Sequence, residues 1–231
     1  MGKQAKLRQQ RRQANVDRQT AIDNFCGAYA LAAPAIIYKH FNETCCLNAT
    51  RVFIDVASSF DIKAEPVVVR AIVMNAKQLE LLKEHGEFPQ NPDVIKEWAA
   101  LGAYSVVIDA LEDPGPAGME LRGWSGHLVA VVGTTMVDSS SRQLSRPKHA
   151  MEYPDVALVR VPPGFADGMS VSIELPNGVA GHYKSIPGVE RYKKMPGWQR
   201  HIGNLEVARE IKHAVDKLLP AAGSRPKVRG A

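Results

Sequence analysis

Apolar residues recur at spacings of three and four along several segments, a pattern that predicts helices with one buried face. Residues 19–40 carry the first such pattern. Pro34 is expected to interrupt that helix, because proline lacks an amide proton and clashes with the preceding turn. The next helix should begin after Asn42-Glu43-Thr44, since Asn and Thr are good helix caps, and end near Asp61. Further helices are predicted over residues 77–85, 92–100 and 205–219.

Short apolar runs bounded by Pro, Gly and Asn predict strands. Asn177-Gly178 is a strong hairpin signal and should pair the strand before it with the His182-Tyr183 segment. The segment from Glu112 to Gly123 is rich in Gly and Pro and predicts a loop. The predicted strands cover residues 67–73, 103–110, 127–133, 156–161 and 171–175.

The order of these elements predicts the fold class. Helices come first, mostly hairpin-connected strands follow, and a helix closes the chain, which is typical of an α+β protein with helices packed on an antiparallel sheet. We expect one domain over residues 19–220, preceded by a basic extension over 1–18 and followed by a basic tail over 221–231.

Composition places the chain among ordinary globular proteins. It has 231 residues, 45% of them hydrophobic and 23% charged. No apolar run approaches the length of a membrane span, and the polar, basic start lacks a signal-peptide core. We therefore expect a cytoplasmic protein without a membrane partner. Its three cysteines are too few for a disulfide framework and should be free thiols.

Positive charge is concentrated at the two ends, while the net charge of the chain is +5. Solvated tails are the ordinary interpretation. The alternative is weak contact with nucleic acid or another polyanion. No aromatic residue lies among the basic ones, so a stacking platform for single strands is not supported. The basic residues are Lys3, Lys6, Arg8, Arg11, Arg12 and Arg18 at one end and Arg225, Lys227 and Arg229 at the other.

Cys46, His127 and Asp138 are the candidate catalytic residues. Cys46 opens a helical pattern, and a helix N-terminus favours the thiolate, the form of cysteine that attacks. His127 opens an apolar strand, where an imidazole could serve as base and then as acid. Asp138 follows a short turn and could orient that imidazole. A hairpin centred near Val132-Gly133 would place His127 and Asp138 opposite one another, provided that the register holds.

Neighbouring residues complete the predicted site. Cys45 would point about 100° away from Cys46 on an ideal helix, so Cys46 is the preferred nucleophile. Cys26 lies within an apolar helix and is predicted to be core. Gly126 leaves room for substrate beside His127, and Trp124 either walls a substrate channel or packs on the core. The oxyanion donor is predicted to be the Cys46 backbone amide, with side chains of His40, Asn42 or Thr44 as alternatives.

The same segments resemble the transglutaminase-like branch of the papain-like cysteine fold, with bacterial arylamine N-acetyltransferases as a neighbouring relative. The resemblance covers roughly residues 40–150. It implies that Cys46, His127 and Asp138 form a triad for acyl transfer, with no cofactor. No aromatic-then-acidic pair follows the cysteine, so acetyl-CoA is not carried over as donor. The matching segments are Cys46-Leu-Asn-Ala-Thr-Arg-Val, Gly126-His127-Leu-Val-Ala, Val137-Asp138 and Arg146-Pro147.

Three functions follow. The first is a cysteine enzyme that acts on an amide or ester carbonyl of a peptide, protein or small molecule through a thioester, as a hydrolase or an acyltransferase. The second is a non-catalytic relative that binds a protein or peptide in the same cleft. The third is a nucleic-acid-associated protein that uses its basic tails. A metal site is disfavoured by the spacing of the candidate ligands, which would be His40, Cys45, Cys46, His127 and Asp138.

Overall fold

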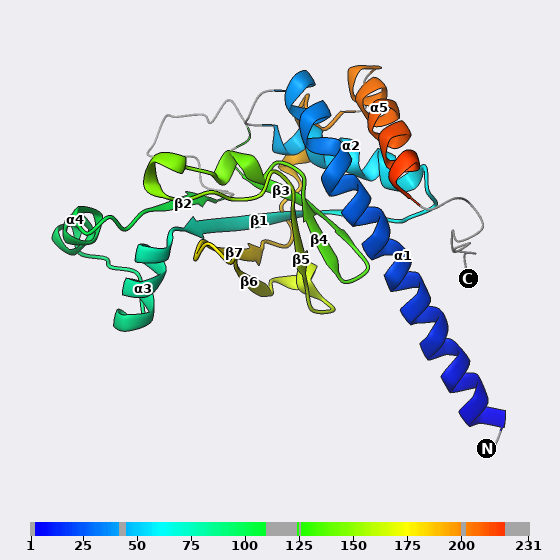
Figure 1. Cartoon of the computed structure of the whole chain (residues 1–231), viewed down its shortest axis with the longest axis horizontal. Coiled ribbons are helices and arrows are strands. Elements are labelled where there is room, and N and C mark those ends of the chain that lie inside the picture. Colours follow the sequence, from blue (N-terminus) through cyan, green and yellow to red (C-terminus); the bar gives the residue numbers. More distant parts are fainter. Residues whose placement is uncertain (1–2, 42–44, 110–123, 125, 200–201, 220–231) are drawn as a thin grey trace.

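The computed structural model describes residues 3–41, 45–109, 124, 126–199 and 202–219. Its mixed helices and antiparallel sheet confirm the α+β class (Figure 1). The helices are α1 (Lys3–His40), α2 (Cys46–Ser58), α3 (Ala76–His85), α4 (Pro92–Ala100) and α5 (Ile202–Leu218). The strands are β1 (Glu65–Met74), β2 (Ser105–Ile108), β3 (His127–Val132), β4 (Thr135–Asp138), β5 (Ala157–Arg160), β6 (Ser170–Glu174) and β7 (Ala180–Ser185).

Every strand pairing in the described sheet is antiparallel, in the order β5-β4-β3-β1-β7-β6. The long strand β1 is central. Its first half pairs with β3, and its second half pairs on the same edge with β2. The predicted β6–β7 hairpin is confirmed, with Val171 opposite Tyr183. The predicted loop over residues 112–123 and the tail over 221–231 lie outside the described residues.

Alternation along the strands separates two cores, because successive side chains of a strand point to opposite faces. Ala130 and Val132 of β3 face α1, α2 and α5 and join the apolar faces of these helices. Val129, the residue before Ala130, faces the other way, into a second core. The sheet curls around this second core and is nearly barrel-shaped. Figure 1 shows α1, α2 and α5 grouped together beside the sheet, with α3 and α4 at its other end.

Helix α1 departs from the sequence prediction at Pro34. The helix continues through this residue without interruption. Tyr29, Ala33 and Ile37, on the turns around it, are fully buried, and this packing holds the helical path despite the lost hydrogen bond.

The stretch Gln4–His40 of α1 is long and apolar enough, by length and composition, to cross a membrane, contrary to the expectation from the sequence. Its apolar residues Phe25, Tyr29 and Ile37 are buried in the core shared with α2 and α5. Of its apolar window, 39% is buried inside the structure.

Candidate active site

The start of α2 is packed against the start of β3, and this contact brings Cys46 to His127. The hydroxyl of Thr50, one turn after Cys46, donates to the carbonyl oxygen of Leu128 at 2.8 Å. Leu128 is the residue after His127. Cys46 and Leu128 also belong to one apolar cluster. Two residues that are 81 positions apart in the chain thus become neighbours through a helix–strand contact.

Cys46 is the first residue of α2, as the sequence predicted, but the residue that caps the helix is Cys45. The Cys45 side chain makes no capping hydrogen bond to the first turn. The Asn42-Glu43-Thr44 segment, expected to cap the helix, lies outside the described residues. The first turn of α2 therefore has no hydrogen bond from the side chain of its capping residue.

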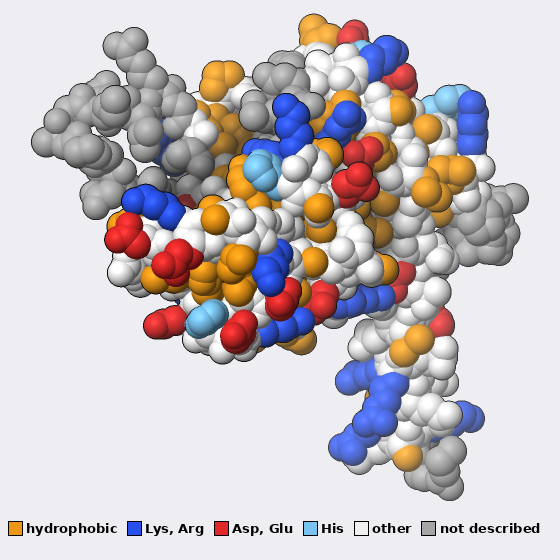
Figure 2. All heavy atoms as spheres, turned by 60° about the vertical axis from the view of Figure 1, so that its left-hand side comes forward, with side chains coloured by type: hydrophobic (Ala, Val, Ile, Leu, Met, Phe, Trp, Pro, Cys, Tyr) orange, Lys and Arg blue, Asp and Glu red, His pale blue; other side chains and the backbone are white. Residues whose placement is uncertain are grey.

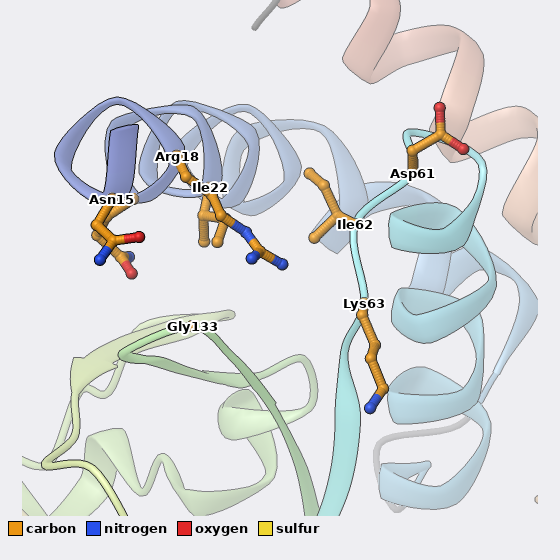
Figure 3. A pocket seen from close by; sticks show the side chains of 8 residues that line it. Asn15, Arg18, Ile22, Asp61, Ile62, Lys63 and Gly133 are labelled. Atoms are coloured by element: carbon orange, nitrogen blue, oxygen red, sulfur yellow. The ribbon is translucent and has the colours of Figure 1, made fainter. Parts of the chain in front are cut away.

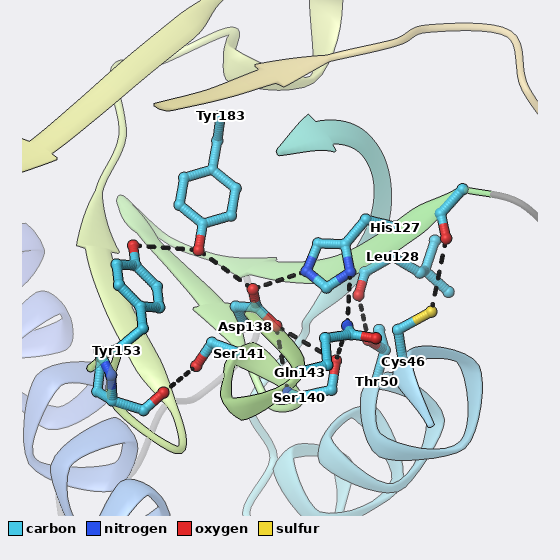
Figure 4. Close-up of polar contacts among 12 residues, drawn as sticks. Cys46, Thr50, His127, Leu128, Asp138, Ser140, Ser141, Gln143, Tyr153 and Tyr183 are labelled. Carbon is cyan, nitrogen blue, oxygen red and sulfur yellow. Dashed lines mark hydrogen bonds and ion pairs between the residues drawn. The ribbon is translucent and has the colours of Figure 1, made fainter. Parts of the chain in front are cut away.

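His127 and Asp138 form a fully buried pair, with 2.7 Å between Nε2 and Oδ2 (Figure 4). The register that joins them differs from the prediction. Val132 pairs with Thr135, so the turn is centred on Gly133-Thr134. This shift moves the partner of each residue by two positions and leaves both side chains on one face of the hairpin. They meet as diagonal neighbours, which are still within reach of long side chains.

Gly133 makes this tight turn possible. Its φ of 57° lies in the left-handed region that favours glycine, and a Cβ there would meet Oε1 of Gln19 at 2.5 Å. The same Gln19 oxygen accepts a hydrogen bond from the Thr134 amide at 3.2 Å. The register that aligns His127 with Asp138 is thus tied to helix α1.

Three further groups orient the Asp138 carboxylate. Oδ1 accepts hydrogen bonds from the Ser140 amide at 3.1 Å and from its hydroxyl at 3.4 Å. Oδ2 accepts one from the Tyr183 hydroxyl of β7 at 3.2 Å, in addition to that from His127. The Tyr153 hydroxyl lies 3.2 Å from that of Tyr183 and extends the network (Figure 4). A carboxylate held by four donors is a rigid partner for an imidazole.

The environment keeps His127 positively charged over an unusually wide pH range. Burial by itself lowers the pKa of the imidazole. The charge and hydrogen bond of Asp138, with a further contribution from Cys46, outweigh burial and raise the pKa to about 10. An imidazolium beside a thiol favours the thiolate.

Gln143 contacts the other ring nitrogen, with 2.9 Å between its Nε2 and His127 Nδ1. Both ring nitrogens of His127 therefore have partners, Asp138 at Nε2 and Gln143 at Nδ1. Gln143 sits on the short 3₁₀ helix η1 (Ser141–Leu144) that follows β4. The sequence analysis missed Gln143, Ser140 and Tyr183. No spacing pattern marks them, because the tertiary fold alone brings them to the triad.

The thiol and its neighbours are closed in by apolar side chains. Cys46 is 6% exposed, and its Sγ lies 3.7 Å from the carbonyl oxygen of Gly126, to which the thiol donates. Trp124 packs in the same cluster as Cys46 and contacts Tyr192 edge to face. Tyr192 makes a second such contact with Trp198. Both predicted substrate-binding residues, Gly126 and Trp124, thus lie beside the thiol.

The other cysteines are part of the core. Cys45 and Cys26 belong to the cluster formed by α1, α2 and α5, and burial raises the pKa of each thiol to about 12. His40, named as an alternative oxyanion donor, faces α5 instead and pairs with Glu210 at 3.0 Å. Asn42 and Thr44 lie outside the described residues. Among the residues that the structure describes, no three His, Cys, Asp or Glu side chains are grouped to hold a metal ion.

Comparison with known protein families, with curated proteins and with solved structures found no match for this chain. Its function is therefore argued from the geometry of the site.

Replacement of Tyr183 by Phe tests the outer part of the network. The change removes one donor to Asp138 and leaves the Tyr153 hydroxyl without its neighbour. We expect the free energy of unfolding in urea to fall by about 1–2 kcal/mol. Tyr104→Phe is the matched control, since its ring stacks on His149 away from the triad. Equal losses in the two variants would contradict a specific role for Tyr183.

Proposed function

We propose that this protein is a cysteine-dependent enzyme that hydrolyses an amide or ester, or transfers its acyl group, through a thioester on Cys46. The observation that carries the proposal is the buried His127–Asp138 pair, 2.7 Å apart and oriented by Ser140 and Tyr183, beside a thiol at a helix start. The resemblance of these segments to transglutaminase-like and papain-like enzymes supports the same class.

The first half of the reaction acylates the thiol. We propose that His127, as an imidazolium, holds the Cys46 proton at Nδ1 in place of the Gln143 contact, and that the Cys46 thiolate attacks the substrate carbonyl carbon as the C=O electron pair moves to oxygen. In this proposal the backbone amide of Cys46, the first residue of α2, stabilises the oxyanion. The tetrahedral intermediate then expels the amine or alcohol, which takes the proton from Nδ1 and leaves a thioester.

The second half regenerates the enzyme. Water or an amine attacks the thioester while His127 Nδ1 accepts the proton of the attacking group. The C–S bond breaks, the Cys46 thiolate leaves, and the proton stays on Nδ1, which restores the starting pair. Water gives a hydrolase and an amine gives an acyltransferase. Asp138 holds Nε2 throughout, so the ring keeps Nδ1 directed toward the reacting atoms.

The aromatic cover makes a non-catalytic protein the second candidate. His127 and Asp138 are fully buried, and Tyr192 and Trp124 share a cluster with Cys46. Under our proposal these rings shift to admit substrate, and they bind its acyl side. Under the alternative they close the site permanently, and only the outer surface binds a partner.

Alkylation of the intact protein by iodoacetamide distinguishes the two. The rate at Cys46 would be followed by mass spectrometry of peptides from pH 5 to 10. We expect modification of Cys46 already at pH 6, well below the range in which ordinary free thiols react. His127→Ala should slow it at least about tenfold at that pH, because the imidazolium that favours the thiolate is lost.

Cys26 and Cys45 are internal controls in the same spectra, since both are buried with raised pKa values. They should stay unmodified in the folded protein. If Cys46 reacts no faster than they do, or if His127→Ala reacts like the wild type, the enzyme proposal fails and the non-catalytic candidate takes its place.

A further inference from the structure

The first half of α1 projects away from the body of the protein (Figure 1). Residues 4–18 are all exposed, whereas Ile22, Phe25 and Tyr29, further along the same helix, are buried. The projecting part is anchored as a continuation of a packed helix, which removes the cost of nucleating a separate one. We call residues 3–18 the arm.

The arm carries a concentrated positive charge. It contains six basic residues and one acidic residue, Asp17, and so has a net charge of +5, equal to that of the whole chain. Asp17 accepts a hydrogen bond from Gln13 at 2.8 Å. Within the described part of the chain, no ion pair engages the arginines of the arm. Figure 2 shows the Lys and Arg side chains gathered along this projection.

Four of these residues share one face of the helix. At 100° per residue, Arg8, Arg11, Arg12 and Arg18 fall within an arc of roughly 120°. Further along the helix, the core residues Ile22, Tyr29 and Ala33 lie on this same face. The face of α1 that packs against the protein body thus becomes an arginine face where the body ends.

A groove lies where the arm leaves the body (Figure 3). Asn15 and Arg18 of the arm form one wall, and Lys63 and the Gly133 turn lie across from them. The enclosed volume is about 320 Å³, and a neighbouring hollow that shares Arg18 and Lys63 adds about 550 Å³. The arginine face therefore ends in a hollow that is lined by Lys63, by the polar side chains of Asn15 and Gln19, and by one carboxylate, that of Asp61.

We propose that the arm and this groove form a binding surface for the phosphate backbone of a nucleic acid. Guanidinium groups bind phosphate oxygens through paired hydrogen bonds, and a row of four along one helix face suits a chain of regularly spaced phosphates. Four glutamines and one asparagine are the uncharged polar residues of the arm, and both types are common phosphate and sugar contacts. A second copy of the chain is a poor occupant, because two arms of charge +5 repel each other.

Fluorescence anisotropy of the full-length protein with labelled 20-base-pair DNA tests the proposal, with duplex RNA and single-stranded DNA as parallel probes. The dissociation constant would be measured at 50, 100 and 200 mM salt. If four arginines each neutralise one phosphate of the DNA duplex, log K should fall with log salt at a slope of about −3.6, which is roughly a 150-fold loss over this range.

The arm variant changes four arginines to glutamine. Its salt slope should be shallower than that of the wild type by about 3–4, and its binding at 50 mM salt should be at least tenfold weaker. The control removes the same charge from four lysines near α3 and α4, at the other end of the sheet, and should bind like the wild type. Circular dichroism checks that both stay helical. The arm variant is R8Q/R11Q/R12Q/R18Q, and the control is K77Q/K83Q/K96Q/K148Q.

Two results would overturn the proposal. The first is equal binding by the arm variant and the control, which would mean that the arm contributes only general charge or nothing. The second is competition by poly-glutamate as effective as that by unlabelled duplex. That outcome would assign the arm to an acidic polypeptide instead of a nucleic acid.

Discussion

Asp138→Ala is expected to lower the free energy of unfolding by about 3–5 kcal/mol at pH 7, because it removes one partner of a fully buried pair. The His127 imidazole then loses the charge and hydrogen bond of Asp138, while burial continues to disfavour its positive charge. The Ser140 amide and the Tyr183 hydroxyl lose their acceptor as well. Urea unfolding followed by circular dichroism measures the loss.

Asp155→Ala is the matched control for this experiment. Its carboxylate is about half exposed and lies 3.9 Å from Arg142, so the change should cost no more than about 1 kcal/mol. A loss at Asp138 as small as that at Asp155 would show that the buried pair contributes nothing beyond a surface one. The orienting role assigned to Asp138 would then lose its energetic basis.

The stabilisation contributed by charged His127 should depend on pH in a defined window. The imidazole has its usual pKa near 6.5 in the unfolded chain, and the fold raises the pKa to about 10. The folded state therefore holds the proton more tightly than the unfolded state. This contribution is complete below about pH 6.5, declines as pH rises, and is absent above about pH 10. Its full size is roughly a few kcal/mol.

His127→Gln isolates the pH-dependent stabilisation that His127 contributes, because Gln can still donate to Asp138 but does not titrate. Urea unfolding of both proteins at pH 6, 8 and 10 gives the difference in stability between them. Contributions of all other titrating groups that the two proteins share cancel in that difference. We expect it to shrink steadily from pH 6 to pH 10. A difference that stays constant over this range would refute a raised pKa for His127.

The hairpin shows how far the sequence could predict the site. A continuous apolar run predicted the strand of His127, and the short turn before Asp138 indicated a hairpin. The predicted register was wrong by two positions, since the turn lies at Gly133-Thr134. The side-chain pairing survived because strand periodicity is two, so a shift by two leaves each side chain on its face. A shift by one would have separated the pair.

The departure at Pro34 has a different cause. Proline disfavours the helix interior as a local property, and the sequence predicted a break there. The helix continues because Tyr29, Ala33 and Ile37 are packed against α2 and α5, which are distant in sequence. Tertiary packing outweighed a local preference, as it often does.

Local periodicity and residue chemistry were enough to predict the helices and strands, the α+β class, and Cys46, His127 and Asp138 as candidates, because each depends on near neighbours in the chain. The hydrogen bonds of Tyr183, Ser140 and Gln143 to the site, the raised pKa of His127 and the burial of the thiol depend on the tertiary structure. The reason is physical. Hydrogen-bond partners and desolvation arise between segments far apart in sequence, and periodicity carries no information about which segments meet.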